Sequence, residues 1–326
     1  MNERKGIAVA GTILLDKINE IAAYPSAGEL TQIRSIKLAP GGCIPNVGCD
    51  LRRMRRDLDV FAIGKIGDDD DGRFLLDYLK ADGVITDGIK AESKEKTSFT
   101  EVMSVSGGAR TFFTYPGASA DFGFDDIDFK NLNCKILHLA YFLLLDKIDS
   151  GDGLKILKEA SMLGIETSID LVSENSDRYS CVLPCLPYTD HLIVNELEAS
   201  KLTSIEATHE NLEQIAKRLF ELGVRKKVII HMPDLACAYS AEYGFTAVPS
   251  YEIDKSEIAG TTGAGDAFCA ASLLGIYDGR SDREILEFAS AAAAISLRSP
   301  DATGSVVSED KIKKIFEKRK RKNLCL

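Results

Sequence analysis

The residues best suited to chemistry lie in one stretch, residues 260–268, which reads Gly-Thr-Thr-Gly-Ala-Gly-Asp-Ala-Phe. A run of small and apolar residues follows, so the pattern predicts a glycine-rich loop that opens a helix. Glycine lets a backbone approach a phosphate closely, and free amides at the start of a helix attract anions. Asp266 would repel a phosphate unless it accepts a proton or holds a metal. The stretch therefore indicates phosphoryl transfer to a hydroxyl with Asp266 as base; the alternative is an ordinary turn with a first-turn acid.

The elements that must position this loop alternate between short apolar runs and helical patterns. Glycine just past a helical pattern is typical of a helix end. The predicted helices are 73–81, 154–163 and 211–222, and the predicted strands are 7–10, 60–63, 136–140, 165–171, 192–194 and 228–231. This β-α alternation predicts a doubly wound, mainly parallel α/β sheet with helices on both faces. Ligands then bind beyond the carboxyl ends of the strands, where Asn195 and Glu196 fall.

Two segments break this rhythm. Residues 13–38 show no helical period, and residues 97–105 and 110–115 predict a hairpin about Ser106-Gly107-Gly108. They predict a small second sheet that could act as a lid excluding water, or else a plain edge hairpin. We accordingly divide the chain into a core (1–12, 39–96 and 116–326) and a β lid (13–38 and 97–115).

Composition excludes some partners. The chain has 326 residues, a net charge of −10 and a pI near 5.1, which argues against a nucleic-acid surface. The basic cluster at 311–322 is expected to be a solvated helix face or tail. The longest apolar run, 136–145, is about half a membrane span, and residues 1–11 contain no signal-peptide core. Eight scattered cysteines without metal-ligand spacing suggest buried thiols, no zinc site and a reducing cytoplasm.

Four stretches taken together resemble the ribokinase, or PfkB, family of carbohydrate kinases. The loop at 260–268 is similar to the family's C-terminal signature. The others are Gly41-Gly42-Cys-Ile-Pro-Asn46, Gly64-Lys-Ile-Gly67-Asp68 continuing to Asp71-Gly72-Arg73, and Asn195-Glu-Leu-Glu198. Their order and spacing match from residue 7 to about 307. The acidic run at 68–71 is interpreted as the start of a helix rather than as a metal site.

The resemblance implies a ribokinase-like fold and ATP-dependent phosphorylation of a sugar hydroxyl. It implies that Asp266 is the catalytic base and that the amides of Gly263, Ala264 and Gly265 form an anion hole. It implies that Glu198 and Asn195 position Mg²⁺ through water, because Mg²⁺ keeps much of its hydration shell. The implied nucleotide-binding residues are Asn195, Thr262, Gly263, Gly265 and Ser290.

The implied sugar site has Asp16, at the end of the first strand, and Asn46 as hydrogen-bonding residues, with Gly41 and Gly42 against the sugar. Asp16 could instead be a surface acid in a turn, Asn46 a helix N-cap and Glu198 a first-turn helix acid. Arg110 in the lid hairpin is expected to face solvent.

The sequence departs from the family pattern at two places. Gly260 stands where the family usually has an acid, which in ribokinases helps to bind a monovalent cation, so weak potassium activation is expected. Residues 231–236, His-Met-Pro-Asp-Leu-Ala, replace a G-x-x-G turn that lies against the nucleotide, so nucleotide binding could differ.

The favoured function is a kinase for a fructose-, ribose- or ketogluconate-type sugar, with a nucleoside kinase as the alternative. A catalytically weak sensor of nucleotide or sugar is the rival from another class. A dinucleotide-dependent oxidoreductase is disfavoured, because only one glycine follows the first strand. The expected partners are a small sugar or nucleoside, and a homodimer through the lid is possible; nucleic acid and membrane are not expected.

Overall fold

The computed structural model describes residues 4–92, 94–105 and 110–324. Its central sheet has nine strands, with β1 inside the sheet between β8 and β4. The strand order is β13 (Gly244–Pro249), β12 (Leu235–Ser240), β11 (Lys227–His231), β10 (His191–Asn195), β9 (Glu166–Leu171), β8 (Ile136–Phe142), β1 (Ile7–Gly11), β4 (Val60–Gly67) and β5 (Ile85–Glu92). Neighbours pair in parallel from β5 to β11, and β12 and β13 add antiparallel pairs.

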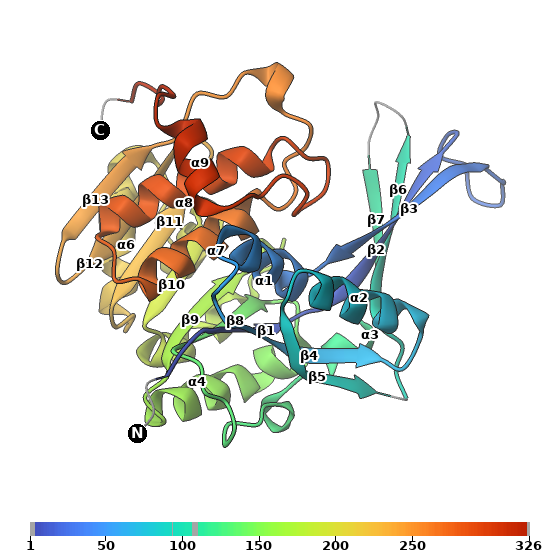
Figure 1. Cartoon of the computed structure of the whole chain (residues 1–326), viewed down its shortest axis with the longest axis horizontal. Helices are drawn as coiled ribbons and strands as arrows, with labels where there is room; N and C mark the ends of the chain where they lie inside the picture. Colours follow the sequence, from blue (N-terminus) through green and yellow to red (C-terminus); the bar gives the residue numbers. More distant parts are fainter. Residues whose placement is uncertain (1–3, 93, 106–109, 325–326) are drawn as a thin grey trace.

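Helices cover both faces of this sheet (Figure 1). One core lies beneath α1 (Cys43–Met54), α2 (Asp70–Ala81), α7 (Ala264–Tyr277), α8 (Asp282–Ser296) and α9 (Glu309–Phe316). The other lies beneath α4 (Gly153–Met162), α5 (Glu196–Thr203) and α6 (Leu212–Glu221). A short helix, α3 (Gly117–Ala120), follows the second sheet. Two cores on opposite faces confirm the predicted doubly wound architecture.

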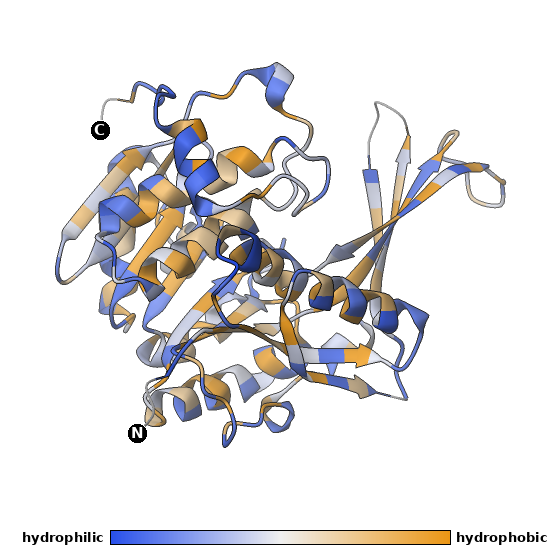
Figure 2. Ribbon diagram, viewed as in Figure 1, coloured by the Kyte–Doolittle hydropathy of each residue, from blue (hydrophilic) through white to orange (hydrophobic). Residues whose placement is uncertain are grey.

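Helix α7 is buried along ten consecutive residues, from Ala267 to Ile276. A helix that is apolar on all sides belongs in the interior, and α7 packs between α1 and α8. Figure 2 shows apolar residues on the central strands and on the helices facing them, and hydrophilic residues along the outer surfaces. The first turn of α7, which carries Asp266, is therefore held by a rigid element.

The second sheet has the order β3-β2-β6-β7 and projects from the body in Figure 1. Its strands are β2 (Leu14–Ile21), β3 (Ile33–Gly41), β6 (Ser98–Val105) and β7 (Arg110–Tyr115). The antiparallel pairing of β6 with β7 confirms the two hairpin strands; the predicted turn at 106–108 lies outside the described residues. Strand β3 continues to Gly41, beyond the expected end of the lid segment at residue 38.

Most of the predicted strands and helices are confirmed within one to four residues at each end. Strands β5, β12 and β13 were not predicted. The acidic run at 68–71 begins α2, as expected: Asp69 is the N-cap and accepts a hydrogen bond from the Gly72 amide. Within the described part of the chain, no helix is long and apolar enough to cross a membrane.

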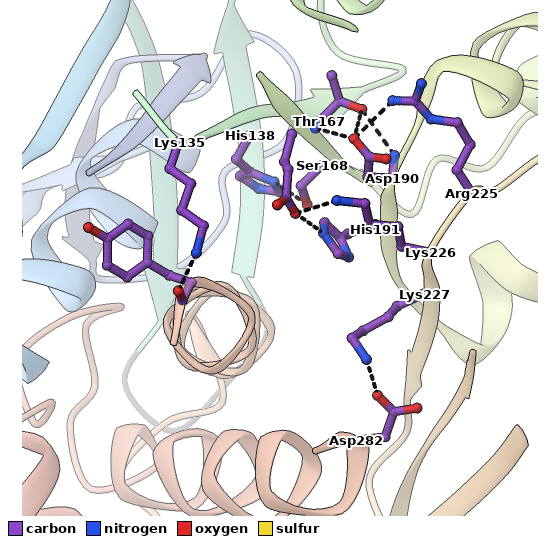
Figure 3. A network of polar contacts seen from close by, with 12 residues as sticks. Lys135, His138, Thr167, Ser168, Asp190, His191, Arg225, Lys226, Lys227 and Asp282 are labelled. Atoms are coloured by element: carbon purple, nitrogen blue, oxygen red, sulfur yellow. Dashed lines mark hydrogen bonds and ion pairs between the residues drawn. The ribbon is translucent and has the colours of Figure 1, made fainter. Parts of the chain in front are cut away.

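Charged residues gather where β9, β10 and β11 begin, and there they are paired (Figure 3). Asp190 accepts from the Thr167 amide and from Arg225, and Lys227 forms an ion pair with buried Asp282. Glu166 lies 3.0 Å from both His191 Nε2 and Lys226 Nζ. These contacts tie together the amino-terminal ends of adjacent strands, at the edge opposite to Asn195.

Candidate active site

Asp266 lies in the first turn of α7, directly after the glycine-rich loop. Gly263 is the N-cap residue with φ 81°, and an added Cβ would lie 2.4 Å from the Ala302 carbonyl oxygen, so only glycine fits this turn. The Asp266 carboxylate accepts hydrogen bonds from Asn46 Nδ2 at 3.0 Å and from the Tyr141 hydroxyl at 2.8 Å. Burial, and then repulsion from Asp170, raises the pKa of Asp266 to about 6.

Asn46 lies on the inner face of α1, one turn into the helix. Gly42, with φ 87°, is the N-cap of α1, and its Cβ position is only 2.7 Å from the Thr12 carbonyl oxygen. The interpretation of Asn46 as an N-cap is therefore wrong, because the helix begins three residues earlier, at Cys43. Its Nδ2 contacts Asp266, while its Oδ1 is buried with no hydrogen-bond partner among the described residues.

Asp16 does not lie at the end of the first strand. Strand β1 ends at Gly11, and the chain then enters the second sheet, where Asp16 is on β2 opposite Ala39 of β3. Strand β1 has only five residues, and the chain passes into the second sheet at Leu14, so Asp16 belongs to the next strand. An added Cβ on Gly41 would lie 2.7 Å from Asp16 Oδ2, so Gly41 lies directly against this carboxylate. Burial raises the pKa of Asp16 to about 6.

Asn195 and Glu198 form a capping box at the start of α5. The Glu198 carboxylate accepts hydrogen bonds from the Asn195 amide at 3.0 Å, from Asn195 Nδ2 at 2.8 Å and from the Ser173 hydroxyl at 2.9 Å. Glu198 is therefore a first-turn acid, as one of the two interpretations predicted. Burial nevertheless raises its pKa to about 7, since the side chain is only 3% exposed.

A cavity of about 600 Å³ opens beside the start of α7. It is lined by Asn195, Thr261, Gly265, Phe268 and Ser290, among other residues. The Ser290 hydroxyl is buried there without a hydrogen-bond partner in the described chain. Of the predicted nucleotide-binding residues, Thr262 and Gly263 do not line the cavity; Thr262 is exposed, and the neighbouring Thr261 and Ala264 line the cavity instead.

The altered segment 231–236 forms a wall of the same cavity. Residues 232–234 connect β11 to β12, and the Met232 amide donates to the Leu235 carbonyl at 2.9 Å. The His231 ring is tilted by 37° against the ring of Phe268, with the ring centroids 4.8 Å apart, and burial lowers the pKa of His231 to about 4. A neutral imidazole and an aromatic ring thus make this wall largely apolar.

The C-terminal segment 319–322, which we call the strap, reaches the same cavity through Lys322, whose Nζ donates to the Pro233 carbonyl at 2.9 Å. The Glu252 amide donates to the Lys320 carbonyl at 2.9 Å, and the Lys322 amide donates to the Ser250 carbonyl at 2.8 Å. The Arg321 guanidinium lies 4.1 Å from the ring of Tyr251, and Lys322 lines the cavity. The expectation of a solvated tail is wrong for these residues, because backbone pairing to residues 250–252 fixes them.

Sequence reasoning missed the roles of Tyr141 and Asp170. Both lie at the carboxyl ends of strands, β8 and β9, which is the one signal that could have indicated them. Asp170 accepts a hydrogen bond from the Tyr141 amide at 2.7 Å, and its other oxygen lies 3.4 Å from His138 Nε2. The negative charge of Asp170 raises the pKa of both Asp266 and Glu198.

Three acids thus converge at the carboxyl edge of the sheet. In residues 4–92, 94–105 and 110–324, no lysine or arginine forms an ion pair with Asp170, Glu198 or Asp266. Burial and the nearby charge of Asp170 raise the pKa of both Glu198 and Asp266, so negative charge here is poorly compensated. Carboxylates of this kind fit a hard divalent cation such as Mg²⁺, which prefers oxygen ligands.

The chain belongs to the pfkB family of carbohydrate kinases, whose family model matches residues 6–309. It is thus a phosphotransferase with an alcohol group as acceptor. It is 26% identical to fructokinase-1 of Zea mays, over 97% of this chain and 98% of that protein. It is 25% identical to a ribokinase of Arabidopsis thaliana, over 95% and 81%.

Solved structures share the fold. The Arabidopsis thaliana ribokinase complexed with ribose and ATP matches with a TM-score of 0.82 at 23% identity, covering 96% of this chain and 99% of that one. A putative ribokinase II from E. coli in complex with ATP and Mg²⁺ matches with a TM-score of 0.79 at 21% identity, covering 96% and 99%. The likeness confirms the ribokinase-like fold.

Proposed function

We propose that this protein transfers the γ-phosphate of ATP to a hydroxyl of a fructose-, ribose- or ketogluconate-type sugar. The observation that carries the proposal is the position of Asp266. This carboxylate lies at the N-terminus of α7, next to a cavity on one side and to Asn46 of α1 on the other. Relatives named as kinases of such sugars, fructokinase, ribokinase and 5-dehydro-2-deoxygluconokinase, match nearly the whole chain.

In this proposal, Asp266 accepts the proton of the attacking hydroxyl. A base with a pKa of about 6 is ionised at neutral pH and is more basic than an ordinary aspartate. The amides of Gly263, Ala264 and Gly265 stabilise the charge on the transferring phosphoryl group. They belong to the loop and first turn of α7, where amides lack intrahelical partners and the helix dipole favours an anion.

The cavity beside α7 is the proposed ATP site. Asn195 and Gly265 would lie toward the phosphates and Ser290 toward the base, with Thr261 replacing Thr262 as a contact of the loop. Gly263, which does not line the cavity, would contribute only its backbone amide. Glu198 and Asn195, with Asp170 nearby, would hold Mg²⁺, which when bound neutralises phosphate charge. A bound cation would also offset the burial, and the smaller repulsion from Asp170, that raise the pKa of Glu198.

The sugar site is proposed between the second sheet and the start of α1. Asp16 and Asn46 would hydrogen-bond the hydroxyls, and Gly41 and Gly42 would let the sugar lie against the backbone. The second sheet would act as the lid that excludes water. Its exposed apolar residues, among them Ile36 at 65% and Phe112 at 62%, fit a homodimer formed through the lid. We expect the enzyme to work in the cytoplasm, where ATP is available.

A panel of acceptors tests this function. ATP consumption is measured with Mg²⁺ on the three sugar types and on nucleosides, with Asp266→Ala as the blank. Turnover on a sugar that disappears in the blank supports the proposal, and turnover only on a nucleoside replaces it with the nucleoside kinase. Asp16→Ala is expected to weaken sugar binding while ATP binding is retained. Thermal stabilisation by ligand without any turnover would favour the sensor instead.

A further inference from the structure

Tyr141 has a backbone conformation that tyrosine rarely adopts. It lies near the carboxyl end of β8 with φ 61°, and Leu143 follows with φ 77°. Side chains other than glycine, asparagine and aspartate are uncommon in this left-handed region. The pairing of β8 with β9 is irregular between Leu139 and Phe142, at the same place. The chain therefore turns out of the regular strand at Tyr141.

This conformation directs both polar groups of Tyr141 at acids of the candidate site. Its amide donates to Asp170 Oδ1 at 2.7 Å, and its hydroxyl donates to Asp266 Oδ1 at 2.8 Å. Asn46 donates to the other oxygen, Asp266 Oδ2, at 3.0 Å. The two donors come from different elements, and together they fix the plane of the Asp266 carboxylate.

We propose that Tyr141 is a positioning residue for Asp266, which holds one carboxylate oxygen and keeps the base correctly oriented for the acceptor hydroxyl. The proposal rests on the proposed kinase function. A carboxylate offers about four lone-pair sites, so two donors leave capacity for a substrate hydroxyl. A base held in one orientation transfers a proton efficiently, because small misplacements of a reacting group lower the rate strongly.

The hydroxyl of Tyr141 also affects the pKa of Asp266. Hydrogen bonds from Tyr141 and Asn46 lower its pKa, whereas burial and Asp170 raise it. The remaining titratable groups that interact with Asp266 are His138 on β8, Cys43 and Asp50 on α1, and Cys269 on α7. Loss of the Tyr141 hydroxyl should therefore raise the pKa of Asp266, and a stronger donor at this position should lower it.

The test compares three variants of the full chain. Tyr141→Phe removes the hydroxyl, and Tyr141→3,5-difluorotyrosine keeps its shape while making it a stronger donor. Tyr277→Phe is the matched control, because its hydroxyl accepts from the Gly6 amide at the far end of α7. The first readout is the ¹³C titration of the Asp266 carboxyl group in the ligand-free protein, assigned with Asp266→Asn. The second is the pH dependence of kcat/KM.

We expect the Asp266 titration and the acid limb of kcat/KM to rise by about one pH unit in Tyr141→Phe. Both should fall in the difluorotyrosine protein and stay unchanged in Tyr277→Phe. In Tyr141→Phe, kcat should fall about tenfold while the KM for ATP is retained. An unchanged Asp266 titration in both Tyr141 variants would overturn the proposal. A shifted titration in a protein without sugar kinase turnover would instead support the contact and reject the proposed function.

Discussion

At the amino-terminal edge of the central sheet carboxylates lie beside cations, whereas at the carboxyl edge they lie beside one another. Glu166, at the first edge, contacts His191 and Lys226, which hold its pKa at about 2. Asp266, at the second, has donors but no cation, and its pKa is raised to about 6. Acids are thus paired with cations at one edge (Figure 3), whereas at the other edge no lysine or arginine among the described residues forms an ion pair with Asp170, Glu198 or Asp266.

This contrast separates two uses of charge. Paired acids such as Asp190 and Asp282 connect elements that are distant in sequence, so their loss should destabilise the fold. Acids such as Asp266 and Glu198 cost folding free energy when they ionise, and that cost is tolerated where a cation or a substrate can later relieve it. Four predictions test this division, from the largest expected effect to the smallest.

Asp266→Asn is expected to lower turnover by roughly 10²–10⁴-fold, because the amide cannot accept the proton of the acceptor hydroxyl. The amide can still accept from Asn46 and donate to Tyr141, so the fold should persist. Steady-state kinetics measure the loss of turnover, and the binding of ATP to the variant shows whether the fold persists. Turnover close to that of the parent protein would remove Asp266 from the mechanism.

Asp282→Ala is expected to destabilise the fold by about 3 kcal/mol, since it leaves Lys227 without its buried partner. Asp282 also accepts a hydrogen bond from the Ser240 hydroxyl at 2.6 Å, which is lost as well. Urea denaturation measures the change, and kcat should be retained. Glu213→Ala is the matched control, because its pair with Lys217 is exposed and should contribute less than about 0.5 kcal/mol. If both variants lost the same free energy of unfolding, the distinction between the buried and the exposed ion pair would be contradicted.

Asp266→Asn is also expected to stabilise the ligand-free protein at pH 8, by on the order of 1 kcal/mol. The folded pKa of Asp266, about 6, lies above its ordinary value of 3.8. The ionised group therefore destabilises the folded protein above pH 6, and this effect fades as the pH falls through 6 and is absent below 3.8. Denaturation of both proteins across this range measures the difference. If the stability gained by Asp266→Asn grew toward low pH, the raised pKa of Asp266 would be contradicted.

Potassium is expected to change turnover only slightly. Gly260 replaces the acid that helps ribokinases to bind a monovalent cation, and a Cβ at this position would lie 2.9 Å from the Ser299 carbonyl oxygen. The loop thus has no space here for an acidic side chain. Turnover is measured with potassium chloride and with tetramethylammonium chloride at equal ionic strength. A large rise with potassium would show that other oxygens form the cation site.

The sequence predicted the sheet well for two reasons. The buried strands are short apolar runs, and glycine marks the ends of the helices between them. The sequence singled out Asp266, Asn46 and Glu198 as candidates because each lies in a motif of fixed spacing, and the structure brings Asn46 into contact with Asp266. It did not predict Tyr141, whose role depends on a left-handed backbone turn and on the pairing of β8 with β9. It placed Asp16 wrongly because nothing in residues 11–16 marks the point where the chain passes from one sheet to the other.

The strap has a practical consequence for work on this protein. Lys320 and Lys322 pair with the backbone at 250–252, and Lys322 lines the proposed ATP cavity, while the described chain begins at the opposite edge of the sheet (Figure 1). A purification tag or fluorescent fusion at the carboxyl terminus would begin four residues after Lys322, which lines the proposed ATP cavity. Fusions are therefore better placed at the amino terminus, and nucleotide affinities measured on carboxyl-terminal fusions should be compared with those of the untagged chain.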